Sequence, residues 1–167
     1  MYISFIPFIP VNRGFMSETK IINFYSTRDE YGCFSNFSAH RIFLKDKVWK
    51  TSEHYFQAQK FAGTEHEEEL RLADSPMTVA KMGRSRKRPL RKDWEDVKDE
   101  IMLEALRAKF TQHKDLKEIL LGTGEAILVE HTKNDSYWAD GGDGSGKNRL
   151  GILLMQVREE LREAEKE

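Results

Sequence analysis

Three polar residues of different chemistry stand at helical spacing in the stretch SEHYFQAQKF. Glu53, Gln57 and Lys60 occupy positions i, i+4 and i+7, so they share one stripe of a helix. A carboxylate, an amide and an amine in a row can form the wall of a pocket that holds a polar ligand. The same pattern is typical of an exposed, salt-bridged stripe, which is the commoner case on spacing alone.

A glycine-rich loop, HTKNDSYWADGGDGSGKNRLG at 131–151, nearly matches the phosphate-binding P-loop pattern. Asn148 stands where that pattern needs a hydroxyl for Mg²⁺, and the preceding strand lies about ten residues too early. Both departures argue against a nucleoside triphosphatase. Gly141, Gly144 and Gly146 still allow positive φ and a close approach to an anion at the helix N-terminus that follows. The alternative is a long turn with helix-capping glycines.

The segment KMGRSRKRPLRK at 81–92 contains seven Lys or Arg residues. Arginine forks fit phosphate oxygens, although most charge runs are solvated loops. The net charge of the whole chain is −1, so this patch is local and does not compel binding to nucleic acid.

The sequence predicts no metal site and no cofactor. The five histidines show no H-x-x-x-H spacing, and the aspartates of the glycine loop do not fit a calcium loop. Cys33 is the single cysteine, which excludes an intramolecular disulfide and favours a reducing, cytoplasmic setting.

Positioning these residues requires several helices and a few short strands. The patterns predict helices at 52–62, 65–73, 75–82, 92–110, 115–124 and 149–163, strands at 21–26 and 126–130, and a hairpin at 41–49 that turns at Lys45–Asp46. The expected helix caps are Thr51 or Ser52, Ser75 with Pro76 at the first helical position, and Asp93, and the expected stops are Gly63 and Gly83.

The length of 167 residues and the hydrophobic fraction of 39% indicate one domain, which we place at 21–163. Residues 1–20 are expected to form an extension outside the core, and 164–167 an acidic tail. The apolar start is broken by two prolines, too short to span a bilayer, and lacks a basic region before it. Neither a membrane span nor a signal peptide is therefore expected.

The motifs SEHYFQAQK, MGR, ALRAKF and NDSYWADGGDGSGKNRLG resemble the YbiA-like N-glycosidases of the NADAR family, over about residues 21–161. The resemblance implies a helix-dominated α+β fold, with several packed helices and a small antiparallel β-sheet, and hydrolysis of a ribosyl N-glycosidic bond. One branch of the family acts on early riboflavin-pathway intermediates, which are ribosylaminopyrimidine phosphates. Another removes ADP-ribose from guanine bases in DNA. The end-to-end similarity favours the first branch.

Cleavage of a ribosyl C1′–N bond needs a carboxylate and an acid but no metal. The catalytic candidates are Glu53, then Asp140 as the second carboxylate with Asp135 in reserve, and Lys60 as a nucleophile that would form a Schiff base. Phe24, Tyr25, Asn36 and Trp138 are expected to contact the base, Arg84, Gly146, Lys147 and Asn148 the phosphate, and Gln57, Asn134 and Asp135 complete the predicted binding set.

Two other classes of protein remain open at this stage. One is a module that binds ADP-ribose without turnover, although it would have no use for Glu53, Lys60 and Asp140 together. The other is a repair enzyme on ADP-ribosylated DNA, which would need the 81–92 patch to contact the DNA backbone. The sequence predicts a phosphorylated small-molecule substrate and no membrane partner, and it does not indicate an oligomeric state.

Overall fold

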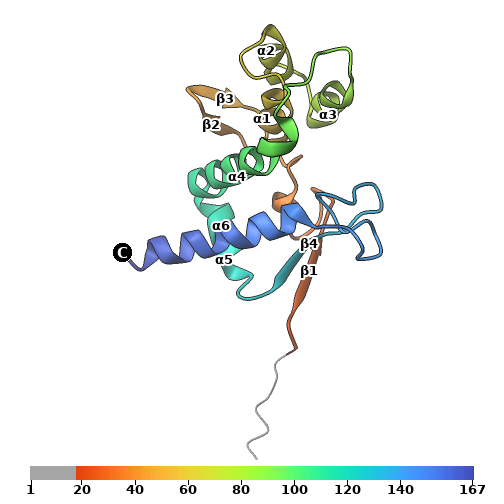
Figure 1. The fold of residues 1–167 in the computed structure, drawn as a ribbon. Helices are drawn as coiled ribbons and strands as arrows, with labels where there is room; N and C mark the ends of the chain where they lie inside the picture. Colours follow the sequence, from red (N-terminus) through yellow and green to blue (C-terminus); the bar gives the residue numbers. More distant parts are fainter. Residues whose placement is uncertain (1–17) are drawn as a thin grey trace, which may run out of the picture.

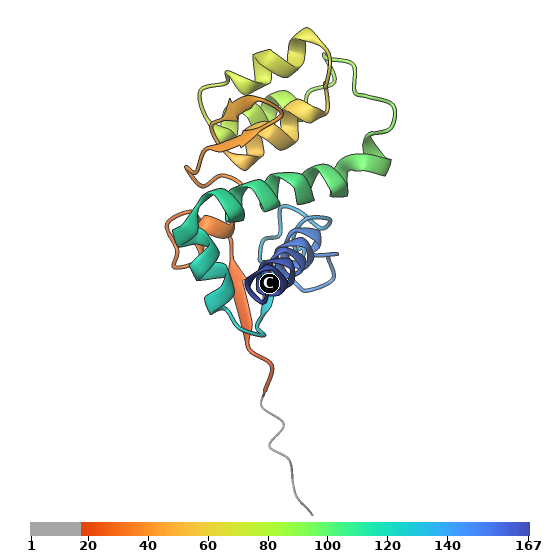
Figure 2. The same ribbon diagram turned by 90° about the vertical axis from the view of Figure 1, so that its left-hand side faces the viewer.

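The computed structural model describes residues 18–167, whose elements form two tiers on either side of one long helix (Figures 1 and 2). The dividing helix is α4 (Trp94–Gln112). One tier contains β2 (Ile42–Leu44), β3 (Lys47–Trp49), α1 (Ser52–Gln59), α2 (Glu65–Arg71) and α3 (Pro76–Arg84). The other contains β1 (Ile21–Phe24), a 3₁₀ turn (Gly32–Phe34), α5 (Lys114–Gly122), β4 (Ile127–Glu130) and α6 (Arg149–Glu165).

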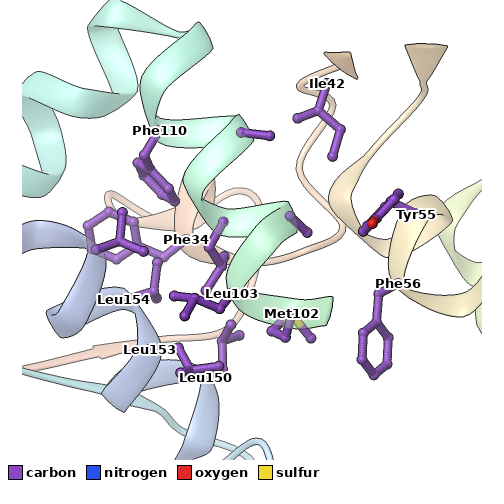
Figure 3. Packing of buried hydrophobic residues seen from close by; sticks show 14 of the residues in the cluster. Phe34, Ile42, Tyr55, Phe56, Met102, Leu103, Phe110, Leu150, Leu153 and Leu154 are labelled. Atoms are coloured by element: carbon purple, nitrogen blue, oxygen red, sulfur yellow. The ribbon is translucent and has the colours of Figure 1, made fainter. Parts of the chain in front are cut away.

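Helix α4 is buried on two sides, because each tier packs against it. It contacts α1 and β2 on one side and α5 and α6 on the other. Figure 3 shows Tyr55 and Phe56 on one flank of α4 and Leu153 and Leu154 on the other. A single apolar stripe would satisfy only one tier, so the buried side chains of α4 are spread around the helix, and one of them is Lys109.

Two separate pairs of strands make up the β-structure of residues 18–167. Strands β2 and β3 form the expected antiparallel hairpin, and Lys45 and Asp46 both adopt positive φ in its turn. Strands β1 and β4 pair in parallel, with Phe24 beside Glu130, although they lie far apart in the sequence. The helix-dominated α+β fold with a small antiparallel sheet is thus confirmed, and the parallel pair is an addition.

Several of the expected helix boundaries need correction, and one is the end of α1, which lies at Gln59 and not at residue 62 before Gly63. Thr51 and Ser75 cap α1 and α3 by accepting hydrogen bonds from N–H groups of the first turn, as predicted. Asp93 makes no such capping bond to α4, because its carboxylate binds Arg91 instead. Gly83 does not end α3, which continues to Arg84. Its lack of a side chain serves packing, since a Cβ atom there would lie 1.9 Å from Oε1 of Gln57.

The two ends of the chain differ in how far the structure describes them. The expected N-terminal extension lies outside the described residues, apart from 18–20. At the other end, α6 continues past its expected stop at 163 to Glu165. None of the helices within residues 18–167 is both long enough and apolar enough to cross a membrane.

Candidate active site

A cavity of about 610 Å³ lies between the two tiers. Its walls come from α1, α3 and the first half of α4 on one side, and from the segments that follow β1 and β4 on the other. Its volume is in the range of small-molecule sites. The predicted site residues that line it are Tyr25, Asn36, Glu53, Gln57, Lys60, Arg84, Asn134, Asp135 and Trp138.

The polar stripe of α1 forms a wall of this cavity and not an exposed surface. All eight residues of α1 are buried, and Glu53, Gln57 and Lys60 are between 6% and 8% exposed. Burying three polar groups in a row costs free energy that their mutual contacts only partly return. Such a stripe is typical of a functional site, so the pocket alternative holds and the surface alternative does not.

Glu53 is held by α1 itself and by the loop before it. Its N–H donates to the carbonyl of Asn36 at 3.1 Å, and Nε2 of Gln57 donates to its Oε1 at 2.7 Å. Burial raises the pKa of Glu53, against the opposing effects of the Gln57 hydrogen bond and the positive charges of Lys60 and Arg84. Oε1 of Gln57 is a buried acceptor without a partner among residues 18–167.

Lys60 lies one turn beyond Gln57, beside two aromatic rings. Its Nζ donates to the carbonyl of Gly83 at 3.3 Å and lies 5.5 Å from the ring centre of Trp94 and 5.9 Å from that of Phe56. Burial lowers the pKa of Lys60 to about 8, with Glu53 opposing the shift. A fraction of this amine is therefore neutral near pH 7, as a nucleophile requires.

The opposite wall carries the aromatic residues that could contact a base. Oδ1 of Asp135 accepts hydrogen bonds from the N–H groups of Tyr137 and Trp138, at 2.8 and 2.7 Å. This turn presents Trp138 edge-on to Phe56 of α1, with ring centres 5.3 Å apart. The side chain of Asn36 is fixed by the hydroxyl of Ser52, which donates to its Oδ1 at 2.8 Å. Asp135 is thus placed at the cavity, where it also organises the wall.

Asp140, the predicted second carboxylate, does not line the cavity. Its Oδ2 lies 2.7 Å from Nδ1 of His131, and its Oδ1 accepts from the N–H groups of Thr132 and Gly142. The bond to His131 holds the pKa of Asp140 below its ordinary value. Its lone pairs are committed to folding the loop, so the geometry gives it a structural part instead of the expected catalytic one.

The glycine loop does not form the expected phosphate cradle, because the N–H groups that lead into α6 already donate to carbonyls of the same loop. The amides of residues 146–150 donate to carbonyls of residues 136–140 at 2.8–3.0 Å. The side chain of Asn148 accepts from the N–H of Glu130 and donates to the carbonyl of Leu128, and so covers one edge of β4. Gly146, Lys147 and Asn148 all lie outside the cavity lining.

Lys147 and Phe24 have other surroundings. Nζ of Lys147 lies 5.3 Å from the ring centre of Tyr137. Phe24 is 2% exposed and packs edge-on against Phe34 in the core, and its neighbour Tyr25 is the residue that reaches the cavity. Adjacent side chains of an extended strand point to opposite faces, so Phe24 and Tyr25 cannot both face the cavity.

Most of the basic segment at 81–92 is not directed at the cavity. Arg88 pairs with Glu69, and Arg91 pairs with Asp93. Arg84 alone from this segment lines the cavity, and it is exposed, so it lies where the cavity meets solvent.

Sequence reasoning missed two charged residues of the lining, Glu130 and Lys98. Lys98 lies on α4, with Nζ 3.9 Å from the ring centre of Tyr137, and it pairs with Glu95. Glu130 ends β4. A charged residue directly after an apolar strand was a usable signal, because ligands bind beyond the carboxyl ends of parallel strands. The parallel pairing itself was not evident from the sequence.

No group of three or more His, Cys, Asp or Glu side chains within residues 18–167 has a geometry that could hold a metal ion. Positive charge is present at the cavity in the side chains of Lys60 and Arg84, which act on Glu53. Positive charge that a reaction needs at this site can therefore come from the chain itself.

Comparison with known proteins places these residues in a family. The NADAR domain family matches residues 23–162. N-glycosidase YbiA of Escherichia coli is 62% identical over 86% of this chain and 90% of its own length. N-glycosidase Npun_R5314 of Nostoc punctiforme is 48% identical over 84% of this chain and 92% of its own length. The chloroplastic riboflavin biosynthesis protein PYRR of Zea mays is 42% identical over 86% of this chain, which corresponds to 26% of that protein.

The fold agrees with these sequence matches. The NMR structure of E. coli YbiA superposes with a TM-score of 0.83 at 59% identity, and the match covers 89% of this chain and 88% of that one. The two chains thus share one fold over nearly their whole lengths. The chain belongs to the NADAR domain family.

Proposed function

We propose that this protein is an N-glycosidase that hydrolyses the ribosyl C1′–N bond of an early riboflavin-pathway intermediate, a ribosylaminopyrimidine phosphate. The observation that carries the proposal is the buried row of Glu53, Gln57 and Lys60 on a cavity with an aromatic opposite wall. It is supported by relatives named N-glycosidases and by one named a riboflavin biosynthesis protein. A module that only binds ADP-ribose would not need a buried carboxylate beside a lysine of lowered pKa.

The reaction develops positive charge on C1′ and on the ring oxygen of the ribose. The Glu53 carboxylate can stabilise that charge and take a proton from the attacking water. Gln57 keeps the carboxylate in one orientation through its hydrogen bond, and the positive charges of Lys60 and Arg84 favour its ionised form. Trp138 offers an aromatic face for the pyrimidine ring.

Lys60 provides a second route through the same site. A ribosylamine can open to an imine, and the neutral amine of Lys60 can add to C1′ and expel the pyrimidine amine, leaving a Schiff base that water hydrolyses. The lowered pKa of Lys60 and its place one turn from Gln57 support this route. Borohydride reduction during turnover distinguishes the two, because only a Schiff base leaves a stable adduct on Lys60.

The positively charged side chains that line the cavity are the candidates for binding the phosphate of the substrate. Arg84 is exposed at the cavity and makes no ion pair among residues 18–167, and Lys98 of α4 also lines the cavity but pairs with Glu95. An arginine fork can bind two phosphate oxygens at once. We therefore assign the phosphate contact to Arg84 in place of the glycine loop.

A parallel incubation tests the proposal. The protein is mixed with a ribosylaminopyrimidine phosphate and, separately, with ADP-ribosylated double-stranded DNA, and the release of ribose 5-phosphate or of ADP-ribose is measured. We expect release of ribose 5-phosphate. Release of ADP-ribose alone would replace this function with the DNA-repair one. The ion pairs of Arg88 and Arg91 leave less free positive charge for a DNA backbone than the sequence suggested.

A further inference from the structure

Glu130 lines the cavity, and the mechanism proposed above gives this residue no role. Its N–H donates to Oδ1 of Asn148 at 3.0 Å, and its carbonyl accepts from the N–H of Asp140 at 2.9 Å. Pairing of β4 with β1 fixes the same residue from the other edge, opposite Phe24. The backbone is thus held on both sides while the side chain lines the cavity at the carboxyl end of a parallel strand.

Among residues 18–167, the charged groups that shift the pKa of the Glu130 carboxyl group are all anions. These anions are Glu53 from α1 and Asp135 and Asp140 from the loop after β4. Within residues 18–167, its carboxyl group makes no hydrogen bond or ion pair, and Lys60 and Arg84 act on Glu53 instead. Burial, reinforced by these negative charges, raises the pKa of Glu130 to about 8. Two carboxyl groups of one cavity are therefore placed in opposite environments, one beside cations and one among anions.

We propose that Glu130 is the general acid of this site, which protonates the departing nitrogen while Glu53 acts on the other reactant. This inference rests on the proposed N-glycosidase function. As the C1′–N bond breaks, its electron pair goes to nitrogen, which takes the proton of Glu130. The oxygen of water bonds to C1′ and gives a proton to Glu53. The products are ribose phosphate and the free aminopyrimidine, and transfer of a proton from Glu53 through solvent to Glu130 restores the enzyme.

A comparison of two substrates with different leaving groups tests the acid role of Glu130 by itself. An amine must be protonated to leave, whereas 4-nitrophenolate leaves as an anion. We expect Glu130→Gln to lower kcat on the ribosylaminopyrimidine phosphate by about 10²–10⁴, the usual contribution of a general acid. The same variant should cleave 4-nitrophenyl riboside 5-phosphate at close to the wild-type rate. Glu125→Gln is the matched control, because it makes the same change at an exposed residue two positions before β4.

The pH profile gives a second measurement on the unmodified protein. Glu130 can act as an acid only while it holds its proton, so kcat of the wild-type protein should fall as the pH rises through about 8. That alkaline decline should be absent for the nitrophenyl substrate.

A third measurement does not depend on any substrate. A carboxyl group whose pKa is raised on folding destabilises the folded state as the pH rises from its ordinary value of 4.5 toward 8. Glutamine does not titrate, so Glu130→Gln should become progressively more stable than wild type across that window, measured by urea unfolding. A structural role for Glu130 predicts the reverse, a variant that is less stable at every pH.

The outcomes separate the two proposals. If the wild-type protein releases no ribose phosphate, the proposed function fails and the acid role fails with it. If the wild-type protein is active and Glu130→Gln loses the same factor on both substrates, or loses none on the ribosylamine, the acid role alone is overturned.

Discussion

At the scale of single residues, this site shows that the chemistry of a carboxyl group depends on which neighbours face it. Glu53 has an amide donor and two cations near it, whereas Asp140 has its oxygens occupied by His131 and two backbone N–H groups. The sequence offered both residues as carboxylate candidates, Glu53 first and Asp140 second. Only Glu53 is buried on the cavity with an acceptor oxygen that can meet a substrate.

We expect Glu53→Gln to fold normally and to lose most of its turnover, by a factor of about 10²–10⁴. Glutamine keeps the shape of the side chain and can still bond Gln57 after an amide rotation, but it can neither take a proton nor stabilise positive charge at C1′. Steady-state kinetics together with a thermal melt measure this. A rate equal to that of wild type in a folded variant would remove Glu53 from the mechanism.

At the scale of elements, the close approach of α3 to α1 keeps this arrangement in place. Gly83 lies against Gln57, whose Nε2 in turn holds Glu53. The carbonyl of Gly83 also accepts the hydrogen bond from Lys60. One residue of α3 thus touches both Gln57 of α1 and Lys60, which directly follows that helix.

Gly83→Ala should therefore reduce activity by more than its effect on folding explains. The added methyl group would meet Oε1 of Gln57 at 1.9 Å and force that side chain to rotate away from Glu53. The lost bond to a charged group is worth about 1.5–3 kcal/mol, or roughly tenfold or more in kcat/KM. Gly122→Ala is the control, because a Cβ atom there meets nothing within 4 Å. Equal activity of the two variants would show that the Gln57 contact is dispensable.

The same contact shows where sequence reasoning stopped. Helical periodicity and capping residues such as Thr51 and Ser75 are local signals, so the starts of α1 and α3 were predicted correctly. Gly83 was interpreted as a stop because a glycine that ends a helix and one that admits a neighbouring helix look the same in sequence. The pairing of β1 with β4 joins two four-residue strands across most of the chain, and nothing local encodes it. Glu130 was missed for that reason.

Whether a residue can bind the phosphate also depends on the element that carries it. A helix N-terminus binds anions only if its N–H groups are free, and those at the start of α6 bond to residues 136–140. We expect Arg84→Ala to raise KM for a phosphorylated substrate more than it lowers kcat, at a cost of about 1.5–3 kcal/mol, because the contact is distant from C1′. Lys147→Ala should change KM little. The opposite ranking of the two variants would return the phosphate to the glycine loop.

At the scale of the whole molecule, the cavity exists because α4 separates two tiers that each supply one wall. The catalytic stripe belongs to the tier of α1 and α3, and the aromatic wall with Glu130 belongs to the tier of β1, β4 and α6. Helix α4 packs against both tiers and so fixes the width of the cavity. The two carboxyl groups therefore line one cavity from opposite tiers.

This arrangement predicts a reaction that needs no metal ion. Lys60 and Arg84 supply the positive charge beside Glu53. In the glycine loop that resembles a P-loop, the N–H groups of residues 146–150 donate to carbonyls of residues 136–140. Asn148 binds the edge of β4 and offers no hydroxyl to Mg²⁺. The protein should retain full activity on the ribosylaminopyrimidine phosphate after dialysis against EDTA, and it should release no phosphate from ATP with Mg²⁺ present. Activity that disappears in EDTA and returns with Mg²⁺ would contradict this account, because the charge at the site would then come from an ion and not from α1 and α3.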